Sequence, residues 1–170
     1  MSGDEARDLE ALFALHHPPL QRYLARLTGD PDLAADAAQE AFVRLLERRP
    51  PAARVRPWLF RVATNLVRDA GRRNRTRRVL GFQGRARLSH GDPPGSPEDV
   101  VGAVAARRLV RDALDALSPK ERKALLMREE GFKHREIARA LGTTTGSVGT
   151  LLSRAIQKAA DRLGGPPEEV

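Results

Sequence analysis

The spacing of apolar residues limits the fold of this 170-residue chain more than any other feature. Apolar residues recur every three or four positions, which places them on one face of an α-helix, and proline or glycine closes the segments. No stretch alternates in the two-residue rhythm of a strand, and no internal repeat is visible. Aromatic residues make up only 4% of the chain, so its cores must consist of Leu, Val and Ala, which favours helices. The sequence therefore predicts an all-α protein.

Two small helical domains are predicted, over residues 8–80 and 97–163. The first contains four helical patterns: over 8–15, over 20–27, from Asp30-Pro31 to the prolines at 50–51, and from 57 into the basic run 72–78. Segment 81–96 is rich in Gly and Pro and has little periodicity, so we expect a flexible linker without a core of its own. We expect the tail 164–170 to be disordered.

The second domain is predicted to contain a helix-turn-helix motif. Ser96 and Ser118 are each followed by a proline and then, three residues after the serine, by an acidic residue, which is typical of a capped helix start. These helices should reach about 117 and 130. A helix over 134–141, a turn at Gly142 and a helix from about Thr145 follow. The residues expected to be buried in this pair are Ile137, Ala138, Leu141, Val148, Leu152, Ala155 and Ile156. An ordinary helical hairpin is the alternative.

The last predicted helix should meet DNA, yet it carries no charge before Arg154. Guanine is usually read by Arg or Lys, so we expect low affinity from this helix alone. Free N–H groups in its first turn can meet a phosphate, Gly149 permits close approach, and Arg154 and Lys158 would contact phosphates. Leu151 is either core or contact. The hydroxyl-bearing candidates for base contacts are Thr144, Thr145, Ser147, Thr150 and Ser153.

Several functional classes are disfavoured by the composition. The chain has no cysteine, which excludes disulfides and thiolate metal sites. Neither a membrane-spanning run nor a signal peptide is visible, so we expect a cytoplasmic protein without membrane contact of its own. The four histidines show no metal or triad spacing, and no phosphate-binding G-x-x-x-x-G-K loop occurs. We therefore expect no catalytic residues, metal, cofactor or small-molecule substrate.

The net charge of +8 is distributed unevenly along the chain. Residues 1–47 contain 4 basic and 9 acidic groups, whereas residues 48–90 contain 13 basic groups and 1 acidic group. A surface that served only solubility would mix the two signs. The segregation indicates two different partners, with a nucleic acid as the natural partner of the basic segment.

Three stretches of the sequence carry a family resemblance. The stretches "GDPDLAADAAQEAFVRLLE" and "RPWLFRVATNLVRDAGRRNR" resemble region 2 of bacterial sigma factors, and "LDALSPKERKALLMREEGFKHREIARALGTTTGSVGTLLSRA" resembles region 4. Their order, with a linker and no third domain between them, resembles the extracytoplasmic function (ECF) group. The resemblance covers roughly residues 8 to 163.

In the first domain, the resemblance implies a protein contact and a DNA contact. Asp36, Gln39 and Glu40 match the acidic helix that docks on the clamp helices of the polymerase β′ subunit; a solvated helix face is the alternative, and nearby Phe42 and Leu45 are expected in the core. Helix 57–73 matches the element that binds the melted −10 strand. The residues implied there are Asn65 at an unstacked base, Arg54, Arg56, Arg61, Arg68, Arg72 and Arg73 at phosphates, and Trp58, which either stacks on a base or lies in the core. Loop 50–56 matches the loop that receives a flipped base.

In the rest of the chain, the resemblance implies that the linker threads the polymerase channel toward the RNA exit. The second domain would hold the β flap and read the −35 element. Gly149, Leu151 and Ile156 are uncharged where the family often has Lys or Arg, and Lys133 replaces the usual Ser or Thr before the helix. A reading helix tethered to polymerase gains effective concentration, which offsets these departures. Members of the group are commonly held by an anti-sigma factor.

The leading hypothesis is a dissociable subunit that binds core RNA polymerase and directs promoter recognition, melting and transcription initiation. A stand-alone, dimeric helix-turn-helix repressor is one alternative, but it leaves the acidic and arginine-rich first domain unexplained. A sigma-like regulator that binds polymerase without initiating is another. A small nucleic-acid-processing enzyme is disfavoured because no acidic metal cluster is present.

Overall fold

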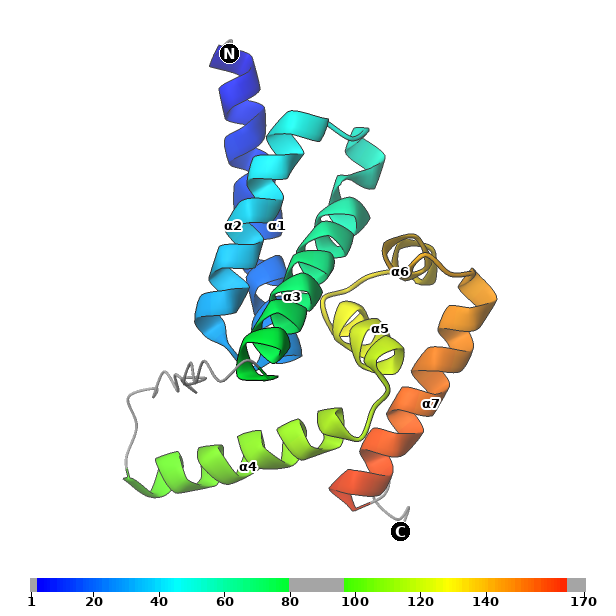
Figure 1. The fold of residues 1–170 in the computed structure, drawn as a ribbon. Coiled ribbons are helices and arrows are strands. Elements are labelled where there is room, and N and C mark those ends of the chain that lie inside the picture. Colours follow the sequence, from blue (N-terminus) through cyan, green and yellow to red (C-terminus); the bar gives the residue numbers. More distant parts are fainter. Residues whose placement is uncertain (1–2, 80–96, 165–170) are drawn as a thin grey trace. The chain divides into compact units, whose positions relative to one another are not determined.

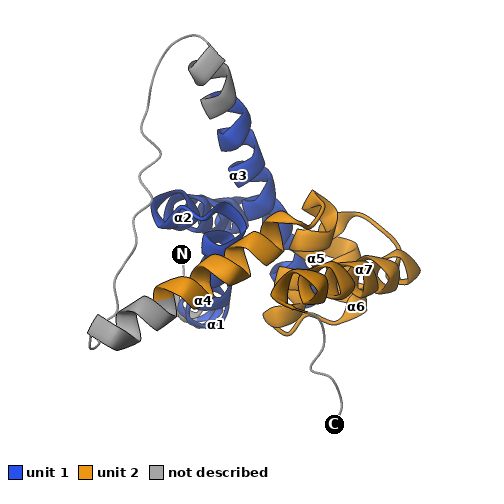
Figure 2. Ribbon diagram, turned by 90° about the horizontal axis from the view of Figure 1, so that it is seen from below, with its two compact units in different colours: residues 1–89 blue, residues 90–170 orange. Residues whose placement is uncertain are grey.

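The computed structural model describes residues 3–79 and 97–164, and all regular structure within these ranges is helical. Contacts divide the chain into two compact units, Met1–Ser89 and His90–Val170 (Figure 2). The all-α prediction is confirmed. The expected linker 81–96 and almost all of the expected tail lie outside the described residues. None of the helices in the described ranges is long and apolar enough to cross a membrane.

Unit 1 is built from three α-helices and one short 3-10 helix among its described residues. They are α1 (Gly3–Thr28), α2 (Pro31–Arg48), η1 (Ala52–Arg54) and α3 (Val55–Val79). The first two run antiparallel, and each α-helix packs on the other two (Figure 1). Four alanines of α2 line the core and let the helices approach closely. The buried side chains include Leu20, Tyr23, Leu24, Ala34, Ala37, Ala38, Ala41, Phe42, Leu45, Leu59 and Phe60.

The helices expected over 8–15 and 20–27 are a single helix, although Pro18 and Pro19 lie inside it. A proline removes one backbone hydrogen bond and usually breaks a helix. Here the two carbonyls that lose a donor belong to exposed residues, Ala14 and Leu15, so water can satisfy them. Packing on α2 also continues on both sides of the prolines. The Phe13 ring stacks on His17 at 4.3 Å and meets Phe42 at 4.9 Å, while the residues after the prolines enter the core.

The connections in unit 1 follow the local sequence. The Asp30 carboxylate accepts hydrogen bonds from the backbone N–H groups of Asp32 and Leu33 at 3.1 and 3.0 Å, which caps α2. Arg49 ends that helix in the left-handed region, at φ 41°. The next helix begins at Val55, two residues before the predicted start, because Pro57 fits in a first turn whose N–H groups lack helical acceptors.

Unit 2 contains α4 (Pro97–Asp115), α5 (Pro119–Glu129), α6 (His134–Leu141) and α7 (Thr145–Leu163). The last helix packs on the other three (Figure 1). The predicted helix-turn-helix, formed by α6 and α7, is present with its turn at Gly142, whose φ of 63° suits glycine. Its core side chains include Leu117, Leu126, Met127, Phe132, Ile137, Val148, Leu152 and Ala155.

Carboxylates cap two helices of unit 2. The Glu121 carboxylate accepts from the Ser118 backbone N–H at 2.8 Å while the Ser118 hydroxyl accepts from the Glu121 N–H at 3.3 Å, so the predicted capping box is present. Lys133 provides no side-chain cap for α6. The Lys133 backbone N–H donates to the Glu136 carboxylate at 2.8 Å, and the Glu136 N–H, which a hydroxyl cap would accept, donates to the Lys133 carbonyl at 2.9 Å.

Candidate nucleic-acid and protein interfaces

Three of the predicted basic residues of α3 share one face with Trp58 and Asn65. Trp58, Arg61, Asn65, Arg68 and Arg72 follow steps of three or four residues and fall within an arc of about 80° on the helix. All but the half-buried Trp58 are exposed. The opposite face, which carries Leu59, Phe60, Ala63 and Thr64, is buried. We call these five residues the α3 stripe; it combines three cations with one amide and one half-buried indole.

The orientation of the stripe is held by a buried hydrogen-bond chain. The Thr64 hydroxyl donates its single hydrogen to the Phe60 carbonyl at 2.6 Å, so Tyr23 of α1 must be the donor in the 3.0 Å bond between the Tyr23 and Thr64 oxygens. Burial raises the pKa of Tyr23, which keeps this donor protonated. Thr64 directly precedes Asn65, so the bond fixes the rotation of α3 where the amide faces outward.

The remaining predicted −10 residues lie beside the stripe. Arg54 is exposed in η1, and Arg73 is exposed but displaced by about 100° from its neighbour Arg72. Arg56 is half-buried near His16 of α1: burial, and after it the charge of Arg56, lower the pKa of that histidine. Arg56 is thus more enclosed than the exposed arginines of the stripe.

The three predicted protein-contact residues share an exposed face of α2. Asp36, Gln39 and Glu40 point away from the alanine-lined core, and Phe42 and Leu45 are confirmed as buried. Arg44 pairs with Glu40 at 2.8 Å, with both side chains 46% exposed, so this ion pair is weak.

Sequence reasoning missed two members of this α2 face. Val43 is 51% exposed, and Glu47 is exposed as well. Together with Asp36 and Glu40 they follow the helical spacing 36, 40, 43, 47, which was the available signal. The face is therefore acidic with an apolar centre, a composition suited to a protein surface more than to DNA.

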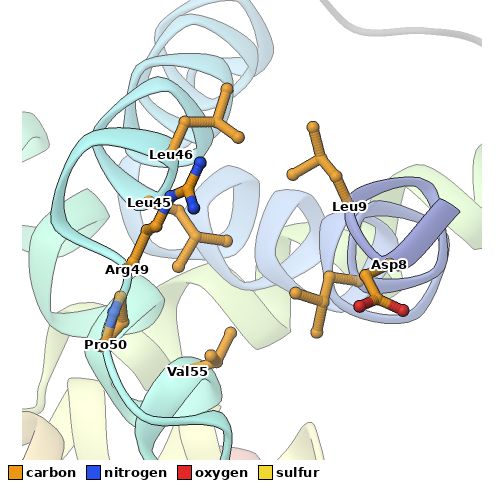
Figure 3. Close-up of a pocket in the computed structure, with 8 residues that line it drawn as sticks. Asp8, Leu9, Leu45, Leu46, Arg49, Pro50 and Val55 are labelled. Carbon is orange, nitrogen blue, oxygen red and sulfur yellow. The ribbon is translucent and has the colours of Figure 1, made fainter. Parts of the chain in front are cut away.

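Unit 1 also contains an apolar groove that the sequence did not predict. It has a volume of about 200 Å³ and lies between the first half of α1, the end of α2 and the start of α3. Leu9 and the α2 leucines face it, with Asp8 and Arg49 beside them (Figure 3). Its lining consists of Asp8, Leu9, Leu12, Leu45, Leu46, Arg49, Pro50 and Val55.

In unit 2 the outward face of α7 carries most of the predicted contact residues. Thr145, Thr150, Ser153 and Arg154 are exposed. Gly149 is half-buried, and a Cβ added there would meet nothing within 4 Å. Packing therefore does not require this glycine, which leaves close approach by a partner as a reason for it.

Two predicted hydroxyls of α7 are engaged with each other. The Thr144 hydroxyl oxygen accepts from the Ser147 backbone N–H at 3.1 Å and lies 2.8 Å from the Ser147 hydroxyl. Both act in the N-cap of α7. The predicted burial of Ile156 is wrong: its side chain is 58% exposed, because it lies about 80° round the helix from Val148 at the centre of the buried face.

Lys158 has an acidic partner inside unit 2. Its ammonium lies 2.8 Å from the nearly buried carboxylate of Glu121 on α5. Its predicted phosphate contact therefore competes with an internal ion pair.

A further pair of cations on α6 was not singled out from the sequence. Arg135 and Arg139 are exposed, one turn apart, on the side opposite buried Ile137. In a helix-turn-helix the first helix crosses the DNA backbone, so their i, i+4 spacing opposite an apolar residue was the signal. Both arginines are suited to phosphate contacts. Within the described residues, no group of His, Asp or Glu is arranged to hold a metal ion.

Comparison with known proteins assigns each of the two units to a protein family. Residues 12–77 match the family described as Sigma-70 region 2, and residues 107–158 match Sigma-70, region 4. The ECF RNA polymerase sigma factor SigL of Mycobacterium tuberculosis is 36% identical over 159 residues, which cover 90% of this chain and 87% of that protein. The chain belongs to the ECF RNA polymerase sigma factors. Sigma factors are non-catalytic regulators, and this one directs transcription initiation.

Other relatives agree with this assignment. The RNA polymerase sigma factor CarQ of Myxococcus xanthus is 32% identical over 175 residues, covering 95% of this chain and 92% of CarQ. Two solved structures share the fold of this sigma factor. The sigma factor RpoE bound to the anti-sigma factor NepR, from Bartonella quintana, has a TM-score of 0.70 at 22% identity and covers 92% of this chain and 97% of that one. CnrH, in complex with the cytosolic domain of CnrY, has a TM-score of 0.65 at 23% identity, with coverages of 93% and 88%.

Proposed function

We propose that this ECF sigma factor joins core RNA polymerase through the α2 face and engages promoter DNA through the α3 stripe and the α6–α7 motif. The observation that carries the proposal lies within unit 1, where α2 exposes an acidic face and α3 exposes a cationic one. The two surfaces have opposite charge and separate helices, so one unit can bind a protein and a nucleic acid at the same time. We place the protein in the cytoplasm with its polymerase.

The polymerase contact is assigned to Asp36, Gln39, Val43, Glu40 and Glu47. Their acidic side chains would steer the face toward basic residues of the β′ clamp helices, and exposed Val43 supplies an apolar centre. The linker would follow the channel toward the RNA exit, and unit 2 would hold the β flap.

The −10 contact is assigned to the α3 stripe together with Arg54, Arg56 and Arg73. Arginines bind phosphates, while the Asn65 amide can offer a donor and an acceptor to one unstacked base. Trp58 is half-buried, and its partly accessible indole would stack on a neighbouring base. Promoter opening would draw its energy from preferential binding of the single strand, without any bond chemistry by the chain itself.

The −35 contact is assigned to the outward face of α7, with α6 as a backbone anchor. Thr145, Gly149, Thr150 and Ser153 would face base edges, Thr144 and Ser147 would hold the first turn, and Arg154 would contact phosphate. Arg135 and Arg139 add two cations. The surface is weakly charged for a DNA-reading helix, so the proposal requires polymerase to hold it in place.

An anti-sigma factor is proposed as the regulatory partner. The two solved sigma factors with this fold were both observed in complexes, one with the anti-sigma factor NepR and the other with the cytosolic domain of CnrY. This similarity supports the same kind of control for the present chain.

Reconstitution with bacterial core RNA polymerase tests the proposed function. Binding to core is measured first, a promoter is then selected from a random DNA pool, and run-off transcription from it is assayed. The variant D36K/E40K should bind core at least about tenfold more weakly, because it reverses two charges at the contact. The matched control E10K reverses an exposed acidic residue on α1 and should bind normally.

Three outcomes would replace the proposal. A chain that fails to bind core removes the polymerase role. A chain that binds core but supports no transcript is a non-initiating regulator. A chain that elutes as a dimer on gel filtration and selects a palindrome without core is a stand-alone repressor.

A further inference from the structure

An ion pair connects the DNA-reading helix to the start of α5. Lys158 of α7 donates from Nζ to Glu121 Oε2 at 2.8 Å and to Oε1 at 3.1 Å. The side chain of Glu121 is only 5% exposed, whereas that of Lys158 is 46% exposed. Glu121 Oε2 also accepts from the Ser118 backbone N–H, so the same carboxylate caps α5 and binds α7.

We propose that Glu121 and Lys158 are positioning residues that set the rotation of α7 on α5, and thereby the face that α7 presents to the upstream promoter element. The inference rests on the proposed function and deepens it. It assigns Lys158 to the interior of unit 2 in place of a DNA phosphate.

The apolar face of α7 is formed by three buried aliphatic side chains, Val148, Leu152 and Ala155. Apolar contacts have little directionality, whereas a charged hydrogen-bonded pair has short distances and a defined geometry. A slip of one residue would move a side chain about 1.5 Å along the helix and about 100° around it, which would break both bonds to Lys158.

The glycine content of the first turns of α7 increases the need for such a positioning contact. Gly146 and Gly149 lie in the first two turns of α7, and a Cβ at either position would meet no neighbour within 4 Å. Glycine lowers helix propensity and contributes no side-chain contact. Apart from buried Val148, this part of α7 contributes few packed side chains, so the directional bonds of Lys158 to Glu121 add a constraint on the rotation of the helix that apolar packing does not supply.

The charges of the pair also oppose a phosphate role for Lys158. A buried carboxylate needs a partner, since an unpaired charge in the interior is strongly unfavourable. An ammonium group has three hydrogens, and two of the hydrogen bonds of Lys158 go to Glu121. Turning this side chain toward DNA would leave Glu121 with only its capping bonds.

Binding of the reconstituted holoenzyme to its selected promoter tests the inference, with the affinity measured over a range of salt concentrations. K158Q should weaken binding about tenfold while the dependence on salt stays as in the wild type. K158R, which keeps the cation, should restore most of the affinity. The matched control R154Q removes a proposed phosphate contact and should reduce the slope of log K against log salt by about 0.9.

E121Q gives an independent readout, because the amide can still accept the Ser118 hydrogen bond. Removing a negative charge should strengthen DNA binding if only long-range electrostatics acted, but a positioning role predicts weaker binding. E121Q/K158Q should be no worse than either single variant, since both remove the same contact. Should E121Q fold poorly, as judged by circular dichroism, K158Q and K158R decide the result.

The inference is overturned if K158Q lowers the salt slope as R154Q does, or if K158Q melts at a lower temperature yet binds the promoter normally well below its melting point. A probe without its −35 element separates this question from the proposed function: the wild type should bind it weakly, and K158Q should bind it equally. If wild-type holoenzyme binds no selected promoter at all, the proposed function itself has failed.

Discussion

At the scale of single residues, neighbouring side chains in this sigma factor have sharply different environments. Thr64 is buried and bonded to Tyr23, while Asn65 beside it is exposed on the α3 stripe. Lys158 is tied to Glu121, while Arg154 one turn earlier faces outward. Helical geometry separates adjacent positions by about 100°, so a single step changes a structural residue into a proposed contact residue.

Asn65 tests the proposed base contact. N65A should leave core binding and duplex binding intact but slow promoter opening about tenfold, because an amide paired with a base edge contributes about 1–3 kcal/mol. Opening is followed with a fluorescent base analogue in the −10 element. An opening rate equal to that of the wild type would contradict the assignment, and R61Q serves as a control for loss of a phosphate contact.

Replacing Tyr23 tests the buried hydrogen bond between α1 and α3. At pH 7, Y23F should lower the free energy of unfolding by about 1 kcal/mol through loss of one hydrogen bond. Burial raises the pKa of Tyr23 above its ordinary 10.0 in the folded state. The unfolded chain therefore ionises first, so the stability that Tyr23 contributes is complete below pH 10 and declines as the pH rises above it.

The advantage of the wild type over Y23F should consequently shrink above about pH 10 and then reverse. Urea unfolding of both proteins at several pH values measures this. Tyr23 is the single tyrosine, so its absorbance reports the ionisation directly. A tyrosine that titrates at its ordinary pH in the folded protein would show that its hydroxyl is not buried and would contradict this prediction.

At the scale of elements, the helices follow local signals except where tertiary packing outweighs them. The helix start at Asp30-Pro31, capping by Ser118 and the turn at Gly142 agree with the predictions from the sequence. In α1, by contrast, two prolines lie in the middle of a helix that packs on α2 both before and after them.

Replacing Pro18 tests the continuity of α1. In a continuous helix P18A should restore a backbone hydrogen bond to Ala14 and raise the free energy of unfolding by about 1 kcal/mol, after allowance for the greater freedom of the unfolded chain. P31A, at the first position of α2 where proline is favoured, should bring no such gain. Chemical denaturation compares the two variants, and a destabilised P18A would indicate two helices joined by a turn.

At the scale of the whole molecule, each unit by itself offers only a small charged surface for binding a partner. Unit 2 presents few cations on α7, and unit 1 separates its acidic α2 face from its basic α3 stripe. In the proposal both units are bound to polymerase, because tethering raises the effective concentration of each weakly binding surface at the DNA.

The free chain and the holoenzyme should therefore differ strongly on the same DNA. Fluorescence anisotropy with a labelled selected promoter should show at least about hundredfold tighter binding when core is present. Scrambling the −35 element should weaken holoenzyme binding but change the free chain little. Equal affinities with and without core would remove the need for tethering.

The sequence by itself determined the helical class, the position of most helix ends and the segregation of charge. These properties depend on spacing along the chain, on caps and on glycine and proline, which act within a few residues. Helical spacing likewise places five of the proposed α3 contacts, three of them arginines, on one face. The family resemblance added the functional interpretation.

Only the tertiary structure decided the features that depend on residues far apart in the sequence. It joined the two predicted segments of α1, exposed Ile156, and paired Lys158 with a carboxylate 37 positions away. It also enclosed Arg56 beside α1 and bonded Tyr23 to Thr64 across 41 positions. Periodicity indicates which face of a helix is apolar, but the partner on that face, and the charge it carries, are set by how the helices pack.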